Sequence, residues 1–188
     1  MLLKAFYKKE VVPKLQESFG YKNVHAVPTV SHVTLNIGVG QGLKDAKFLE
    51  TAERTLARIS GQRPVKTKAR ISISTFKIRK GNVVGMKVTL RGKRMWDFLE
   101  RFLRVTLPRV RDFRGLSQKS FDGQGNYSIG LREHVAFPEI PPDEIETIHG
   151  MQITIATTAD GDDEARALLK GLGLPLREET TKSSKSKK

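Results

Sequence analysis

Apolar and polar residues alternate in several stretches of the chain, with the period of two that is typical of strands with one buried face. The clearest example extends from Val84 to Leu90, where Lys87 and Thr89, followed by Arg91, occupy the face opposite the apolar residues. The same period predicts strands at residues 33–37, 64–68, 71–76, 127–131 and 151–157. A turn signal, Gly81-Asn82, follows the basic run 77–80, which predicts a hairpin with a basic tip between the strands at 71–76 and 84–90.

Apolar residues at helical spacing predict four helices, in the segment up to Phe19 and at residues 44–59, 94–107 and 162–172. Proline is tolerated only in a first helical turn, so Pro13 predicts a break near Glu10 followed by a second short helix, and Pro108 predicts a helix end. Asp162 or Asp163 is expected to cap the last helix. Gly61 and Gly173 suit the C-terminal caps of the second and fourth helices. Residues 109–124 are polar, basic and rich in glycine, which predicts a long loop.

This mixture predicts an α+β fold: a single domain with a mainly antiparallel sheet, helices packed on one face and a projecting basic hairpin. The domain is expected to span residues 1–176. Residues 177–188 hold five Lys/Arg, two Glu and no large apolar side chain, and are expected to form a disordered basic tail. The chain has no cysteine, no signal-peptide pattern and no long apolar run, so we expect a soluble cytoplasmic protein.

The net charge of +14 is concentrated in one block of the sequence. Residues 63–114 contain 16 Lys/Arg and 3 Asp/Glu, whereas residues 139–164 contain 8 Asp/Glu and no Lys or Arg. A basic region of this density favours a polyanionic partner, above all a nucleic acid, over an ordinary solvated face. The acidic run lacks the pattern of a calcium loop and is typical of a solvated or protein-binding face.

No pattern in the sequence indicates catalysis, a cofactor or a metal. The glycines of 38–42 follow a strand, but their spacing does not match a dinucleotide fingerprint, and they favour a tight turn or a close approach to another macromolecule. The four histidines, 25, 32, 134 and 149, have no metal-ligand spacing. An enzyme acting on nucleic acid would need a metal or a general base, and neither is indicated.

The alternation at 84–91 places cations and a hydroxyl on one face of a strand, where they can contact phosphates and ribose hydroxyls. That face has no aromatic residue, so recognition of a structured RNA by shape and backbone is favoured over base stacking. Arg109, Arg111 and Arg114 follow in the predicted loop. Asp112 either orients one of these guanidinium groups or forms a local ion pair, and the sequence leaves both interpretations open.

Several long motifs closely resemble the bacterial large-subunit ribosomal protein five family, over about residues 6–176. They are TLNIGVG at 34–40, SGQRP at 60–64, KVTLRG at 87–92, LPRVRDFRGLS at 107–117, KSFDG at 119–123, GNYS at 125–128, FPEI at 137–140 and GMQITI at 150–155. The resemblance implies a non-enzymatic constituent of the large subunit that binds 5S rRNA and helps attach it to 23S rRNA in the central protuberance. It also implies that a basic hairpin contacts the peptidyl-site tRNA, and that the other side faces small-subunit ribosomal protein thirteen.

The resemblance implies that Asn36, Gln62, Thr89 and Arg91 face 5S rRNA. Together with the basic block it gives two expected sets of binding residues. The expected rRNA-binding residues are Asn36, Gly38, Gln62, Arg63, Lys66, Lys68, Lys87, Thr89, Arg91, Arg109, Arg111 and Arg114. The expected tRNA-binding residues are Arg70, Ser72, Lys77, Arg79, Lys80 and Asn82. No cofactor, metal, membrane partner or homo-oligomer is expected.

The chain departs from the family pattern at a few positions. Thr29 and His32 stand where the family commonly has basic residues, which should weaken attraction of RNA near the sheet edge at neutral pH. Ser74-Thr75 stands where Ala-Gly is usual, which should stiffen the hairpin tip. The alternative function is a general RNA-binding module or RNA chaperone outside the ribosome, which would bind many RNAs alike.

Overall fold

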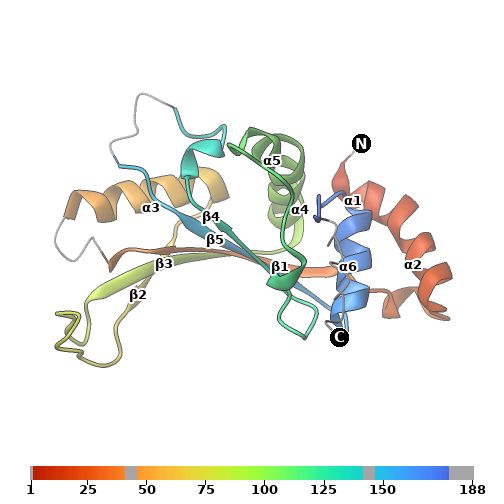
Figure 1. The fold of residues 1–188 in the computed structure, drawn as a ribbon, viewed down its shortest axis with the longest axis horizontal. Helices are drawn as coiled ribbons and strands as arrows, with labels where there is room; N and C mark the ends of the chain where they lie inside the picture. Colours follow the sequence, from red (N-terminus) through yellow and green to blue (C-terminus); the bar gives the residue numbers. More distant parts are fainter. Residues whose placement is uncertain (1, 41–45, 142–146, 178–188) are drawn as a thin grey trace, which may run out of the picture.

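The structure is a computed structural model that describes residues 2–40, 46–141 and 147–177. Its centre is a five-stranded antiparallel sheet with the strand order β2-β3-β1-β5-β4 (Figure 1). The strands are β1 (Val30–Gly38), β2 (Val65–Lys68), β3 (Val83–Leu90), β4 (Tyr127–Leu131) and β5 (Met151–Thr157). The α-helices are α1 (Leu3–Phe6), α2 (Val12–Phe19), α3 (Ala46–Ser60), α4 (Gly92–Arg101), α5 (Leu107–Arg109) and α6 (Asp162–Gly171). The expected α+β class is confirmed.

Helices α3, α4 and α5 lie on one side of the sheet, while α1, α2 and α6 gather at one end of the molecule (Figure 1). The apolar residues of the alternating strands face this helical layer, so that Val33, Leu35 and Ile37 of β1 are completely buried. Phe98 and Phe102 stack on each other with ring centroids 5.8 Å apart, within the same core. No described helix lies on the opposite side of the sheet, which leaves one sheet face open.

Hydrogen bonds and a ring contact hold the N-terminal helices against the rest of the fold. The Tyr7 hydroxyl donates to the Pro28 carbonyl oxygen at 2.9 Å, and its ring packs against Trp96 of α4 at 5.4 Å between centroids. The Leu3 backbone N–H donates to the Glu100 carboxylate at 3.1 Å. The contacts of Leu3 and Trp96 join α1 and the turn after it to α4, and the bond to Pro28 joins that turn to the segment before β1.

Both prolines that were expected to interrupt or end a helix follow a π-helical turn. One turn covers Tyr7–Val11 and the other Phe102–Thr106, and each is followed by a short α-helix with Pro13 or Pro108 in its first turn. The helical path therefore continues through the predicted break near residue 10, and it ends just after Pro108 at the last residue of α5. A proline ring clashes with the carbonyl four residues earlier in a regular helix, and in both cases that carbonyl belongs to the wider π turn.

The predicted strand at 71–76 is wrong, and the predicted hairpin is made differently. Strand β2 pairs directly with β3, and residues 69–82 form a long connection that we call the arm. Within the arm, Ile73 and Ile78 form only an isolated bridge around a turn, with N···O distances of 2.9 and 3.1 Å. Residues 71–76 are exposed, so their alternation has no core to face.

The ends of several elements follow the predicted chemistry, with one correction. Gly61 and Gly173 have positive φ after α3 and α6, as expected of C-terminal caps. The N-cap of α6 is Gly161, not an aspartate. Asp162 instead accepts hydrogen bonds from the backbone N–H groups of Gly123 and Gly125 at 3.2 and 3.0 Å.

The long loop after α5 is confirmed, although Arg109 is still helical and residues Gln118–Ser120 form one 3-10 turn. Its middle pairs with the C-terminal segment, because the Arg177 N–H donates to the Leu116 carbonyl at 2.9 Å. Arg177 was assigned to the tail, and residues 178–188 lie outside the described residues. Of the predicted glycine turn 38–42, residues 41 and 42 also lie outside them, as do residues 44 and 45 of the predicted second helix.

Candidate nucleic-acid interface

The open face of the sheet has two parallel rows of residues that cross four strands, and all of these residues except Gly130 have polar side chains. The strand register places Thr89, Thr34, Thr154 and Ser128 side by side, and we call this set the hydroxyl row. The neighbouring set, which we call the amide row, places Lys87 beside Asn36, Asn36 beside Gln152, and Gln152 beside Gly130. Paired residues of an antiparallel sheet point to the same side, and the alternate residues of these strands are buried under the helices. The open face is therefore polar across β3, β1, β5 and β4, whereas Val65 of β2, which pairs with Lys87, adds an exposed apolar side chain at the β2 edge.

Most side chains of the two rows have no hydrogen-bond partner among the described residues. The exception is the contact between the hydroxyls of Ser128 and Thr154 at 3.1 Å. The side chains of Thr34, Thr89 and Asn36 are partly exposed and make no other hydrogen bond or ion pair within the described part of the chain. The donors and acceptors of these three side chains are thus free to bind a ligand without breaking bonds inside the protein, whereas Ser128 and Thr154 already share one bond.

The short loop between α3 and β2 hydrogen-bonds to β3 where β2 no longer pairs with it. Strand β2 pairs with β3 only up to Lys87, so the carbonyl of Thr89 lies beyond the ladder. The Gln62 side-chain amide donates to this carbonyl at 3.2 Å. The Ser60 hydroxyl fixes the same loop: it lies 2.6 Å from the Leu56 carbonyl oxygen and 2.9 Å from that of Gln62, to either of which it can donate, and it accepts from the Gln62 N–H at 3.2 Å. Gln62 thereby holds the backbone of the strand that carries Thr89 and Lys87.

Two further charged or titratable groups lie at the end of the open face. Arg91 follows β3, is exposed, and keeps an extended backbone as the N-cap of α4. His32 of β1 pairs with Ala156 and is half-buried. Burial, together with the positive charge of Arg91, lowers the pKa of His32, so its imidazole is neutral at neutral pH.

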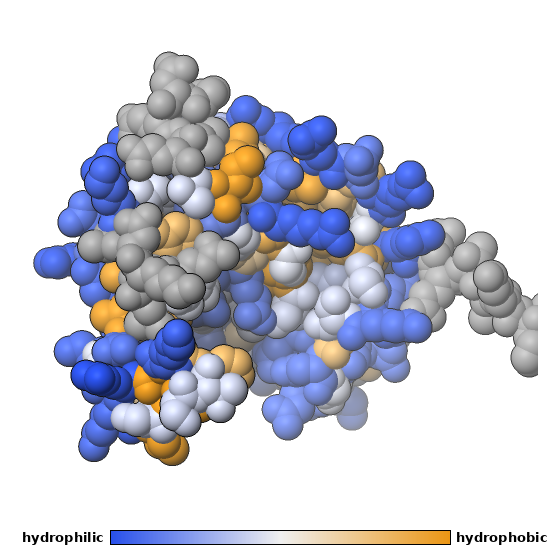
Figure 2. All heavy atoms as spheres, turned by 60° about the vertical axis from the view of Figure 1, so that its left-hand side comes forward, coloured by the Kyte–Doolittle hydropathy of each residue, from blue (hydrophilic) through white to orange (hydrophobic). Residues whose placement is uncertain are grey.

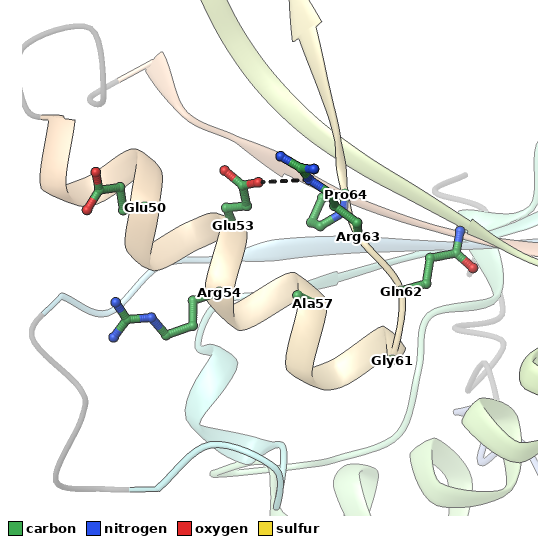
Figure 3. A pocket seen from close by; sticks show the side chains of 8 residues that line it. All are labelled: Glu50, Glu53, Arg54, Ala57, Gly61, Gln62, Arg63 and Pro64. Carbon is green, nitrogen blue, oxygen red and sulfur yellow. Dashed lines mark ion pairs between the residues drawn. The ribbon is translucent and has the colours of Figure 1, made fainter.

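Two of the expected rRNA-binding cations point to the helix side of the sheet edge. Lys66 pairs with Met86, which is buried under the helices, and its ammonium forms an ion pair with Glu53 of α3 at 2.7 Å. Figure 3 shows Arg63 facing the same carboxylate, at 3.7 Å, while Gln62 points away from them. The bond from Lys66 lowers the pKa of Glu53, and the charge of Arg63 contributes to the shift. Arg63 and Glu53 line a shallow depression beside α3 rather than the open face.

Of the three arginines of the long loop, Arg109 lies away from the open face. Arg109 is the last residue of α5, which lies on the helix side of the sheet (Figure 1), and Arg111 and Arg114 follow it; all three are exposed. Asp112 forms no ion pair with any of them within the described residues and has a left-handed φ of 50°. Neither role considered for Asp112 is observed.

The arm is a second surface with a different composition. Its exposed cations are Arg70, Lys77, Arg79 and Lys80. It also exposes Ile71, Ile73 and Phe76, and Phe76 is 68% exposed. Figure 2 brings the arm end of the molecule forward and shows hydrophobic patches among the hydrophilic side chains there. Several exposed apolar side chains gathered on one short segment mark it as a candidate binding surface.

The hydrogen bonds of the arm fix its shape. The Ser72 hydroxyl accepts from the Lys80 N–H at 2.9 Å, and the Asn82 carbonyl accepts from the Ala69 N–H at 2.8 Å. Lys77 has a left-handed φ of 55° at the turn, and its N–H donates to the Ser74 carbonyl at 3.0 Å. Two of the expected tRNA-binding residues, Ser72 and Asn82, therefore also hold the arm together.

The expected residues thus fall into separate regions. Asn36, Lys87, Thr89 and Arg91 belong to the open face, and Gly38 adjoins it by pairing with Gly85. Gln62, Arg63, Lys66 and Lys68 lie along the β2 edge, with Lys68 next to an irregularity in the pairing with β3. Sequence reasoning missed Thr34, Gln152, Thr154 and Ser128, although the alternation within β1, β4 and β5 was a signal that could have found them.

The described residues contain no group of three or more His, Asp or Glu side chains placed to hold a metal ion. In the same part of the chain, no helix is long and apolar enough to cross a membrane.

Comparison with known proteins identifies the family of this chain. The family model of ribosomal protein L5 matches residues 23–79, and the model of the C-terminus of the same ribosomal protein family matches residues 83–176. The large ribosomal subunit protein uL5 of Symbiobacterium thermophilum is 56% identical over 176 residues, which cover 94% of this chain and 98% of that protein. The chain belongs to the uL5 family.

The proteins of the uL5 family are structural constituents of the large ribosomal subunit and are not enzymes. Association with rRNA and with the ribosome follows from this membership.

Proposed function

We propose that this uL5 protein binds 5S rRNA through the open face of its sheet and helps attach it to 23S rRNA in the large subunit. The observation that carries the proposal is the juxtaposition of Lys87, Asn36 and Thr89 on a sheet face that no described helix covers. Lys87 can contact a phosphate, while the amide and the hydroxyl can bond ribose or base edges. Arg91 extends this group beyond the end of β3.

The neutral groups are the source of selectivity in this proposal. Attraction between a chain of net charge +14 and RNA is strong but depends little on RNA sequence. A neutral hydroxyl or amide adds binding free energy only where the RNA shape presents a partner at the right place, and a mismatch leaves polar groups unpaired. Thr89 therefore tests the site better than any of its cations.

The decisive experiment is a titration of Thr89→Val against 5S rRNA and a length-matched control RNA at several salt concentrations. Valine preserves the shape and strand propensity of threonine, and the loss of one hydrogen bond should weaken 5S binding by about 1–3 kcal/mol with an unchanged salt slope. Thr75→Val is the matched control, because it removes an exposed hydroxyl from the arm. Unchanged 5S affinity in Thr89→Val would remove Thr89 from the site. Equal affinity of the unmodified protein for both RNAs would favour the general RNA-binding alternative.

We also propose that the arm contacts the peptidyl-site tRNA and that another side of the protein faces small-subunit ribosomal protein thirteen. Four exposed cations and a fixed turn support an RNA contact at the arm, because the cations meet phosphates and the turn presents them without further ordering. The arm projects from the β2–β3 end of the sheet (Figure 1), so it can reach a partner other than the RNA on the open face.

A further inference from the structure

The hydroxyl and amide rows continue well beyond the residues assigned above to 5S rRNA. Thr34 connects Thr89 to Thr154, and Ser128 continues the row onto β4 at the far edge of the sheet. Adjacent strands lie about 4.8 Å apart, so a row across four strands is roughly 14 Å long. At an axial rise of about 3.4 Å per nucleotide of one strand, this length corresponds to several nucleotides.

We propose that the hydroxyl row is a track for the ribose side of an RNA backbone, which enters at Lys87 and Arg91, crosses β1 and β5, and leaves over β4. This inference rests on the proposed function, because it extends the same site to the other half of the sheet. The new contact residues are Thr34, Thr154, Ser128 and Gln152.

The chemistry of the row matches the ribose 2′-hydroxyl. A Ser or Thr hydroxyl both donates and accepts a hydrogen bond, and so does the 2′-hydroxyl, which DNA lacks. The cations of the face lie at the β3 end, whereas β4 and β5 contain no charged residue at all. Phosphate attraction therefore acts at one end of the track, and neutral hydrogen bonding to ribose acts along the rest.

The shape of the face also fits a backbone passing over it. Gly130 ends the amide row, is exposed, and has no side chain to stand in the way. A Cβ atom at Gly130 would meet no other atom within 4 Å, and its φ is not in the left-handed region. A larger residue is thus tolerated by the fold and would project into the space above β4.

A protein partner fits this half of the sheet less well. Protein interfaces depend on a few large apolar or aromatic anchors. None of the described large hydrophobic residues that are exposed belongs to β1, β4 or β5. The row is continuous with the cations Lys87 and Arg91, and this favours an anionic ligand over a protein.

The test is a titration of the full chain against 5S rRNA with Thr154→Val, Ser128→Ala and Gly130→Leu, with Thr75→Val as control. Thr154→Val and Ser128→Ala should each weaken binding about 3- to 10-fold, the net worth of one hydrogen bond whose lost partner is partly replaced by water or by the neighbouring hydroxyl. Gly130→Leu should weaken it at least as much by steric exclusion, and Thr75→Val should leave it unchanged. Circular dichroism and urea unfolding check the fold of each variant, and Gly130→Leu keeps the test valid if Thr154→Val is destabilised.

Interference mapping with sparsely 2′-deoxy-substituted 5S rRNA provides the second readout. Deoxy positions that weaken binding of the unmodified protein should stop doing so in Thr154→Val, because the protein partner of that hydroxyl is gone. Unchanged affinity in both Thr154→Val and Gly130→Leu would overturn the track and leave β4 and β5 to a protein partner. Loss of 5S preference by the unmodified chain would overturn the proposed function instead. The track would then be tested by the affinity of the same variants for the control RNA. Absence of binding to either RNA would overturn both.

Discussion

Thr89 and Arg63 belong to the same basic block, but the fold gives one of them an internal partner for its side chain and not the other. Arg63 faces Glu53 and shares that carboxylate with Lys66, so part of its charge is already compensated. The Thr89 hydroxyl has no partner among the described residues, while its carbonyl is held by Gln62. Positive charge was visible in the sequence, but the acid on α3 that compensates it was not, because residues 53 and 66 approach only through packing.

Two buried histidines, His134 and His149, form a stacked pair whose pKa values are lowered. The rings of His134 and His149 stack at 3.9 Å between centroids, and both residues are buried. Nδ1 of His134 lies 3.2 Å from both the backbone N–H and the carbonyl oxygen of His149, so it accepts from the N–H in the tautomer that leaves this nitrogen unprotonated. Burial, and then the neighbouring His134, lowers the pKa of His149 to about 4, and burial lowers the pKa of His134.

Acidification should therefore destabilise the protein before most carboxylates titrate. Between the unfolded-state pKa of about 6.5 and the folded-state value, the unfolded chain binds protons that the folded chain does not, so stability falls as pH falls through this window. We expect the free energy of unfolding to drop by about 2 kcal/mol from His149 alone between pH 7 and pH 5, measured by urea unfolding. His149→Phe should flatten this slope, and His25→Asn, at an exposed position, should retain it. An equal slope in His149→Phe and the unmodified protein would contradict the assignment.

At the scale of elements, local patterns predicted strands and helices well but could not predict which strands pair. The alternation of 84–90, 127–131 and 151–157 reappears as β3, β4 and β5, because each has a helical layer to bury one face against. The alternation of 71–76 has no such layer and produces an exposed arm. The rows on the open face depend on the register between β1, β3, β4 and β5, which no single stretch of sequence contains.

The π turns are a second case in which a local rule was incomplete. The rule that proline breaks a helix assumes hydrogen bonds to the residue four positions earlier. In both π turns the bond reaches five positions back, from the Val12 N–H to the Tyr7 carbonyl and from the Leu107 N–H to the Phe102 carbonyl. Both π turns and their flanking helices pack onto the common core, and this packing stabilises a continuous helical path through the wider turn.

The arm should function as an element separate from the sheet. We expect Arg79→Ala combined with Lys80→Ala to preserve 5S rRNA affinity within about twofold, because both residues are exposed on the arm and contact neither row. The same double variant should reduce tRNA occupancy of the peptidyl site on ribosomes that carry it, measured by filter binding. Phe76→Ala is a companion variant that removes an exposed ring without removing charge. A parallel loss of both activities would mean that the arm and the open face are a single surface.

At the scale of the whole molecule, the charge is distributed less simply than the two blocks of sequence suggest. The first turn of α6 contains Asp162, Asp163 and Glu164, at the opposite end of the molecule from the arm (Figure 1). The neighbouring N-terminal helices, however, expose Lys8 and Lys9, so that end is mixed. Of the 16 cations at residues 63–114, Arg63, Lys66, Arg101 and Arg104 form ion pairs with glutamates. In the proposed function, the positive charges of the open face and the arm are the part of the field that acts on RNA.

This distribution predicts that the salt dependence of RNA binding is set locally and not by net charge. Each cation that neutralises a phosphate adds about one to the slope of log affinity against log salt concentration. Lys87→Ala should therefore lower the slope for 5S rRNA by about one. Lys170→Ala, an exposed cation in the last turn of α6, removes the same charge from the opposite end and should leave the slope unchanged. Salt titrations of the three proteins on 5S rRNA measure this directly. Equal slope changes in the two variants would show that the RNA responds to the total charge of the chain, and Lys87 would lose its assignment to a phosphate contact.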